Sequence, residues 1–80
     1  MRKSHELLLK FRFDPRYSFS QVQVGYVDRG ATGDHSVVDG NHIMALDSYY
    51  MEIETESVTK YIPYHRIRKI LYAGEVVWER

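Results

Sequence analysis

The sequence predicts an α+β fold in which one N-terminal helix packs on an antiparallel β-meander of about five to six strands. Helical spacing of apolar residues occurs near the N-terminus, whereas apolar and polar residues alternate in most of the later segments. Short breakers that contain glycine separate these segments, as is typical of antiparallel hairpins. Such a sheet can curl into a half-open barrel. With 80 residues, the chain has room for a single domain, residues 1–80.

The first predicted element is a short helix over roughly His5–Arg12. Ser4 is a suitable N-cap, and the apolar residues lie three and four positions apart, which places them on one face: Leu7, Leu8 and Phe11. Asp14-Pro15 should end the helix, because the residue before a proline avoids the helical conformation.

Two strands are expected next. Residues Gln21–Arg29 alternate, with one apolar face made of Val22, Val24 and Tyr26. A turn over Asp28–Asp34 leads to a second strand near His35–Val38, which the breaker Asp39-Gly40-Asn41 ends.

The middle of the chain is less regular. Ile43–Leu46 is too short to assign and is expected to be one helical turn or a loop. Tyr49–Glu54 alternates again and predicts a third strand, with Tyr49, Met51 and Ile53 on one face and Tyr50, Glu52 and Glu54 on the other.

The last part of the chain predicts extended segments and a hairpin. Pro63 separates Val58–Ile62 from Tyr64–Tyr72, and because proline lacks a backbone donor it indicates an edge, a bend or a bulge. Ala73-Gly74 should form the turn to Glu75–Glu79, with Val76 and Trp78 facing inward.

Composition excludes several classes of protein. Apolar residues make up 44% and charged residues 28% of the chain, which is typical of a soluble globular domain. Cysteine is absent, so disulfides and thiolate metal sites are excluded, and an intracellular, cytoplasmic location is expected. The apolar runs are far shorter than the ~20 residues of a membrane helix, so no association with a membrane is expected.

Charge is distributed unevenly along a chain whose formal net charge is zero. Residues 1–16 carry a net +3 and residues 57–72 a net +4, whereas residues 28–56 carry a net −6. If the two basic blocks meet in space, the protein presents a positive face; the alternative is a mixed, solvated surface. Long duplex DNA is an unlikely ligand, because its binding favours an overall basic protein.

Histidines are the first candidates for chemistry. A metal site would need three of them to converge, and their spacing matches no known ligand motif, so neither a metal nor any other cofactor is expected: the four are His5, His35, His42 and His65. His35 and His65 could act together as general acid and base in RNA cleavage, although a lone histidine is more often a surface residue.

Two segments could bind anions. The turn Asp28–Asp34 contains two glycines and could form a nest of backbone N–H groups. It could equally be a hairpin loop that needs positive φ at Gly30 and Gly33. In Tyr61–Lys69, aromatic rings alternate with cations, which suits single-stranded nucleic acid but also an edge strand kept soluble by its charges.

Four segments in this order and spacing resemble a known family: Arg12–Arg16, Tyr26–Asp34, Ile62–Ile67 and Gly74–Glu79. The chain resembles, over nearly its whole length, the small and mostly archaeal family called the RNA cyclic group end recognition domain. It departs from the family pattern at Phe13, where tryptophan is usual, and at Thr32, where proline is usual.

The resemblance implies a non-enzymatic RNA-binding module for RNA 3′ ends that carry a 2′,3′-cyclic phosphate or a related terminal phosphate. Under this hypothesis the phosphate contacts come from Arg29, His65 and Arg66, with Arg16 as a further candidate, and Tyr64 stacks the last base. Asp28 or Asp34 would orient Arg29 or accept a ribose hydroxyl.

Two alternatives remain open for the function. The first is an RNA-end phosphoesterase or nuclease that uses His65 as acid or base. The second is a scaffold that docks on an RNA-processing protein, through an apolar patch or an edge strand. The expected partners are therefore RNA, an RNA-processing protein or a second copy of the chain.

Overall fold

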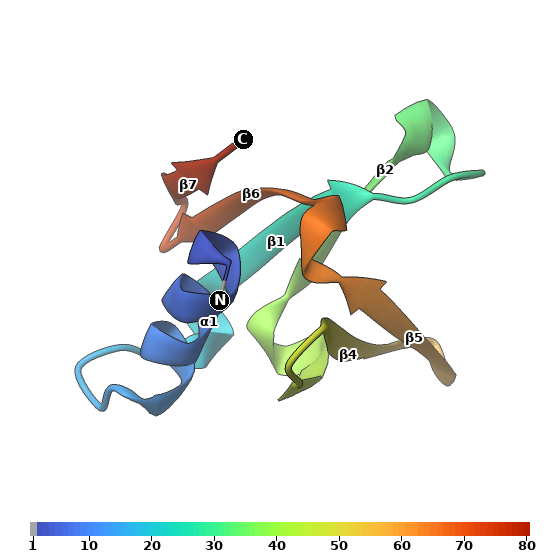
Figure 1. The fold of residues 1–80 in the computed structure, drawn as a ribbon. Coiled ribbons are helices and arrows are strands. Elements are labelled where there is room, and N and C mark those ends of the chain that lie inside the picture. The colour runs from blue at the N-terminus through green and yellow to red at the C-terminus, as the bar shows by residue number, and fades with distance from the viewer. Residues whose placement is uncertain (1) are drawn as a thin grey trace.

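The computed structural model describes residues 2–80 and contains one helix, seven strands and four three-residue 3-10 turns (Figure 1). The helix is α1 (Lys3–Phe13), and the strands are β1 (Val22–Val27), β2 (His35–Asp39), β3 (Ile43–Leu46), β4 (Tyr50–Thr55), β5 (Val58–Pro63), β6 (Ile67–Tyr72) and β7 (Glu75–Glu79). The predicted α+β class, with an N-terminal helix and antiparallel strands, is confirmed.

The seven strands form two separate antiparallel sheets. The larger sheet has the order β2-β1-β6-β7, and the smaller has the order β3-β4-β5. The chain passes from the first sheet to the second between β2 and β3, and it returns between β5 and β6. Pro63 ends β5, which is an edge strand, as a residue without a backbone donor requires.

Each 3-10 turn leads directly into a strand. The turns are η1 (Phe19–Gln21), η2 (Thr32–Asp34), η3 (Gly40–His42) and η4 (Tyr64–Arg66), and they precede β1, β2, β3 and β6. Such a turn has about three residues per revolution, whereas side chains in a strand alternate every two residues. The turn therefore interrupts the alternation of inward and outward side chains before the strand begins.

Helix α1 differs from the prediction at its start and agrees at its end. The N-cap is Arg2, and Ser4 lies inside the first turn with only 1% of its surface exposed, so Ser4 does not cap the helix. The C-cap is Asp14, as Asp14-Pro15 predicts. Across residues 2–80, no helix combines the length and apolar character that crossing a membrane requires.

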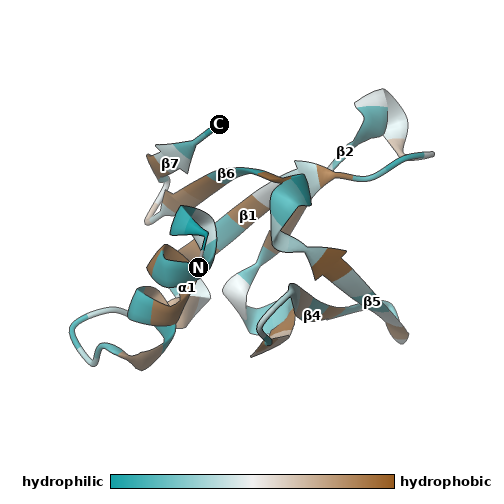
Figure 2. Cartoon of the chain, viewed as in Figure 1, coloured by the Kyte–Doolittle hydropathy of each residue, from teal (hydrophilic) through white to brown (hydrophobic). Residues whose placement is uncertain are grey.

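The core lies between α1 and the inner faces of the sheets. The alternation in β1 is confirmed, since Val22, Val24 and Tyr26 are all buried. They pack in one cluster with residues from α1 and the other strands, which include Leu8, Phe11, Val38, Ile43, Met51, Ile53, Ile62, Ile67 and Ile70. Figure 2 shows hydrophobic and hydrophilic residues following one another along β1 and β6.

Two local predictions are wrong, and a third is off by one residue. Ile43–Leu46 is strand β3, which pairs with β4, and not a helical turn or loop. The strand predicted over Tyr49–Glu54 is β4, which begins at Tyr50, so Tyr49 precedes it and is 83% exposed. Val76 is half-exposed, since the register of β7 against β6 shifts at Ile70/Leu71; Trp78 does pack against the core.

Candidate functional site

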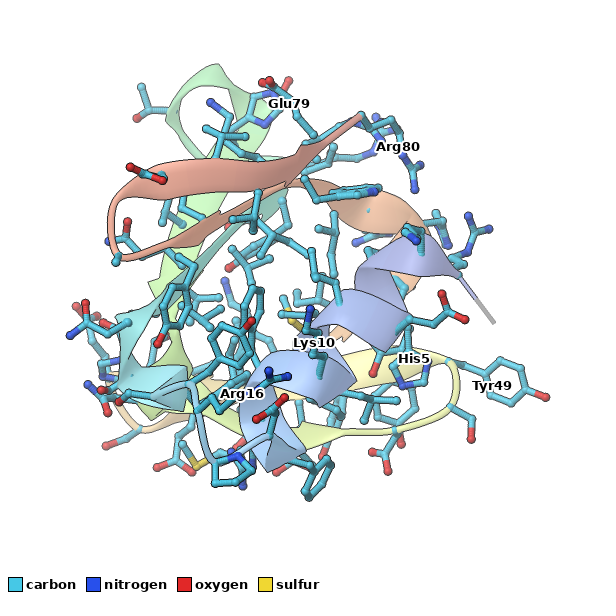
Figure 3. All side chains as sticks on the ribbon, turned by 90° about the vertical axis from the view of Figure 1, so that its left-hand side faces the viewer. His5, Lys10, Arg16, Tyr49, Glu79 and Arg80 are labelled. Carbon is cyan, nitrogen blue, oxygen red and sulfur yellow. The ribbon has the colours of Figure 1, made fainter. Side chains whose placement is uncertain are left out.

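The cation predicted from the segment after the helix, Arg16, is bound to a neighbouring residue. The Arg16 guanidinium donates to both carboxylate oxygens of Asp14, with Nη2 2.7 Å from Oδ2. These hydrogen bonds lower the pKa of Asp14 to about 2. Figure 3 shows Arg16 and Tyr49 near opposite ends of α1, so Arg16 lies away from the exposed ring of Tyr49.

The loop over Asp28–Asp34 is a hairpin loop. Gly30 and Gly33 have φ values of 97° and 69°, and the Gly30 N–H donates to Asp34 Oδ1 at 3.3 Å. Asp28 accepts from the Ser36 hydroxyl at 2.6 Å and lies 3.7 Å from the ammonium of Lys60.

Arg29 is exposed in this loop. Among residues 2–80, no hydrogen bond or ion pair connects it with Asp28 or Asp34. Arg29 is also not among the residues that line the hollow beside η4, where His65 lies.

Tyr64, which the sequence predicts to stack a base, is a core residue, and in this structure its ring is not open to a base. Only 2% of Tyr64 is exposed, and its ring lies 4.1 Å from that of His5 in a stacked arrangement. The Tyr64 hydroxyl donates to the backbone carbonyl of Asp47 at 2.6 Å. Burial, with a smaller effect of the Asp47 charge, raises the pKa of Tyr64 to about 12, so the phenol stays a donor.

Beside η4 lies a hollow of about 670 Å³, which we call the η4 hollow. Its walls come from the start of α1, from the β3–β4 connection with the start of β4, and from the β5–η4 junction: Arg2, Ser48, Tyr49, Tyr50, Pro63, Tyr64 and His65. Two of the predicted contact residues line the hollow, the buried Tyr64 and the exposed His65, and Arg66 is the exposed residue that follows them. No carboxylate side chain is among the residues that line the hollow.

Two residues of this hollow, Arg2 and Tyr49, are not among those that the sequence analysis selects. Tyr49 is 83% exposed, and its ring extends away from the body of the molecule (Figure 3). Its neighbour Tyr50 is held by an edge-to-face contact with Tyr61, with ring centres 5.3 Å apart. Two adjacent tyrosines after Asp47-Ser48 were the available signal.

The backbone of η4 is anchored by two arginines from the larger sheet. The carbonyl oxygen of His65 accepts from Arg80 Nη1 at 2.9 Å and from Arg68 Nη1 at 3.4 Å. Arg2 belongs to the first basic block of the sequence and His65 to the second, so these two blocks meet at the η4 hollow. The hollow thus combines the guanidinium of Arg2, the ring of His65 on an anchored turn and the exposed ring of Tyr49, which suits an anion attached to a flat ring.

The two histidines considered for acid–base chemistry line different hollows. His65 lines the η4 hollow, whereas His35 lies in a groove on the larger sheet. In the part of the chain that the structure describes, no three histidine or carboxylate side chains come together as a metal site would require.

His5 is buried, and its ring stacks against the ring of Tyr64. It is 5% exposed, and its Nε2 has no hydrogen-bond partner among residues 2–80, which is also true of the buried Ser4 hydroxyl. Burial lowers the pKa of His5 below its ordinary value of 6.5, because the charged imidazolium loses its hydration. The neutral ring is therefore the form that the fold accommodates.

Replacing His5 by phenylalanine should remove a pH dependence of stability. In the wild type, the unfolded chain takes up a proton at His5 before the folded protein does, so stability falls as the pH decreases below about 6.5. The His5→Phe variant keeps a ring against Tyr64 but cannot titrate there. Urea denaturation from pH 7.5 to pH 5 should give a difference between the two proteins that grows only below about 6.5; parallel curves would contradict the buried neutral imidazole.

The comparisons with known proteins agree on one family. A family model described as the MJ1316 RNA cyclic group end recognition domain matches residues 1–80. A UPF0248 protein of Archaeoglobus fulgidus is 37% identical over 71 residues, which cover 89% of this chain and 96% of the relative. A UPF0248 protein of Thermococcus gammatolerans is 34% identical over 83 residues, covering 100% and 94% of the two chains. No solved structure gives a significant match.

Proposed function

The chain belongs to the family of the MJ1316 RNA cyclic group end recognition domain, and on that premise we propose that it binds RNA through the η4 hollow. The terminal phosphate of an RNA 3′ end, in its 2′,3′-cyclic form or a related one, occupies this hollow. The observation that carries the proposal is that one hollow, without a carboxylate in its lining, joins Arg2, His65 and the exposed ring of Tyr49.

Three side chains supply the contacts to the phosphate. The Arg2 guanidinium offers a planar set of donors that can give two parallel hydrogen bonds to phosphate oxygens. The His65 ring offers one N–H donor, on a turn whose carbonyl Arg68 and Arg80 hold in place. The exposed Arg66 adds positive charge next to His65. A cyclic phosphate carries a single negative charge, so these few cationic groups are sufficient.

Tyr49 supplies the contact to the terminal base. Stacking of a base on an aromatic ring contributes roughly 1–3 kcal/mol and tolerates every base. The ring of Tyr49 is available because it is 83% exposed, whereas Tyr50 is held against Tyr61 and supports it. The proposal therefore assigns base stacking to Tyr49 in place of the buried Tyr64.

The test is whether affinity depends on the RNA end and on Arg2. We expect the protein to bind a single-stranded RNA octamer with a 2′,3′-cyclic phosphate at least about tenfold more tightly than the same octamer with a 3′-hydroxyl. The Arg2→Gln variant should lose this preference, because a charge-assisted hydrogen bond to phosphate is worth about 1.5–3 kcal/mol. Fluorescence anisotropy titrations at one fixed salt concentration measure both ratios.

Two control variants separate end recognition from general effects. Arg16→Gln removes the same charge from a residue outside the hollow and should keep the preference. Tyr49→Ala should lower the affinity for both octamers by a similar factor, because stacking on the base does not depend on the terminal phosphate. Equal affinity of the wild type for the two octamers would reject the proposal.

A further inference from the structure

A second concave surface lies on the face of the larger sheet that points away from the core. The register aligns Val37, Gly25, Lys69 and Glu79 in one row across β2, β1, β6 and β7. Their neighbours in sequence point inward, since Val24, Val38 and Ile70 are buried. A groove of about 550 Å³ follows this row, and we call it the sheet groove.

The floor of the sheet groove is bare backbone at its centre. Gly25 has no side chain there, and a Cβ at this position would lie 3.7 Å from Lys69 Cβ, at an ordinary contact distance. The space above Gly25 is therefore not needed for close packing of the strands. Val37, which is 67% exposed, and Leu71 provide apolar surface on either side.

The charge of the groove is mainly positive. Arg68, Lys69 and Arg80 line it, and the carboxylate side chain among the lining residues is that of Glu79, which lies 3.7 Å from the Lys69 ammonium. His35 lies at the β2 side. Cations around a strip of apolar surface and backbone match the sugar-phosphate chain of a single-stranded nucleic acid.

Two hydrogen bonds connect the sheet groove with the η4 hollow. Arg68 and Arg80 line the groove, and both donate to the carbonyl oxygen of His65. His65 itself lines the η4 hollow. The two surfaces are therefore neighbours, although they have no lining residue in common.

We propose that the sheet groove binds the single-stranded RNA that leads to the end held in the η4 hollow. This inference rests on the proposed function, which places the RNA end in the η4 hollow. It adds that the protein also binds the unpaired stretch of RNA that precedes this end. Four strands spaced about 4.8 Å apart give the groove a length of about 14 Å, which exceeds a single nucleotide.

The test compares RNA lengths in variants that alter only the groove. The Lys69→Gln variant removes one cation that lines the groove, and Gly25→Val fills the floor with a side chain that suits a strand. Both should weaken binding of the octamer at least about tenfold, with either a cyclic phosphate or a hydroxyl at its end. Both should leave binding of a dinucleotide 2′,3′-cyclic phosphate within about twofold of wild type.

Salt dependence adds a second readout for the charge variant. Each phosphate contact on a single strand contributes about 0.7 to the slope of log affinity against log salt, so the Lys69→Gln variant should lose about 0.7. The matched control is Lys10→Gln, which removes one exposed cation from α1 and should leave the octamer slope unchanged.

Three outcomes would overturn the inference. The first is octamer affinity within about twofold of wild type in both groove variants, and the second is an equal loss for dinucleotide and octamer. The third is displacement of the octamer by a polyglutamate peptide as effectively as by unlabelled octamer, which would point to an acidic protein segment. A wild type that does not distinguish cyclic phosphate from hydroxyl, yet loses octamer binding in the groove variants, would reject end recognition and support the groove.

Discussion

The Gly40→Ala variant is expected to lose roughly 3 kcal/mol or more of unfolding free energy. A Cβ at position 40 would overlap the backbone carbonyl oxygen of Phe19 and lie 2.7 Å from its carbonyl carbon. Backbone cannot move aside as the end of a side chain can, so the two 3-10 turns η1 and η3 would have to separate. A domain of 80 residues has about 4–12 kcal/mol of stability in total, so this loss removes much of it.

The loss of stability should be large because η3 connects the two sheets. It follows β2 of the larger sheet directly and leads into β3 of the smaller one, while η1 leads into β1. Separating η1 from η3 therefore disturbs the connection between the sheets as well as one contact.

Urea denaturation followed by circular dichroism measures the loss. Gly25→Ala is the matched control, because its new Cβ would meet Lys69 Cβ at 3.7 Å and it should change stability by less than about 1 kcal/mol. If Gly40→Ala resembled this control, the close approach of η1 and η3 would be wrong.

Local patterns in the sequence predicted the elements that depend on neighbouring residues. The buried face of β1 follows from strict alternation, and the end of α1 follows from Asp14-Pro15. The turn at Ala73-Gly74 is likewise a local feature, with φ values of 51° and 84°. These features need no information about distant parts of the chain.

The errors occur where a 3-10 turn or a pairing partner changes the pattern. Tyr64 was expected on an extended segment, but it lies in η4, where three residues per turn rotate it into the core. Ile43–Leu46 is a strand because the following strand β4 pairs with it, and four residues are too few to show a period of their own.

The candidate site was harder to predict for the same reason. Arg2, Tyr49 and His65 come from three distant segments, and only the folded chain places them around one hollow. Of the seven residues predicted to contact RNA, His65 lies in that hollow as an exposed group, and Arg66 lies next to it. The aromatic and basic character of Tyr61–Lys69 was thus a useful signal, although it could not say which ring faces the solvent.

Replacing Tyr64 by alanine should lower the unfolding free energy by about 3–5 kcal/mol, the usual loss for a large buried ring. The change would empty the space beside His5, whose ring lies 4.1 Å away, and leave the carbonyl of Asp47 without its donor. The Tyr64→Phe variant keeps the ring and loses only the hydroxyl, so it should cost about 1–2 kcal/mol. Urea denaturation of the two variants beside the wild type separates ring from hydroxyl.

The same pair of variants tests whether Tyr64 supports the site or contacts the RNA. If Tyr64 acts only as part of the core, Tyr64→Phe should bind the cyclic-phosphate octamer within about twofold of wild type, although it is less stable. Tyr49→Ala should show the opposite behaviour, with near-normal stability and weaker binding, because its ring is 83% exposed. Weaker RNA binding by Tyr64→Phe at a temperature where it is fully folded would mean that the hydroxyl reaches the ligand, and that the buried position of Tyr64 opens on binding.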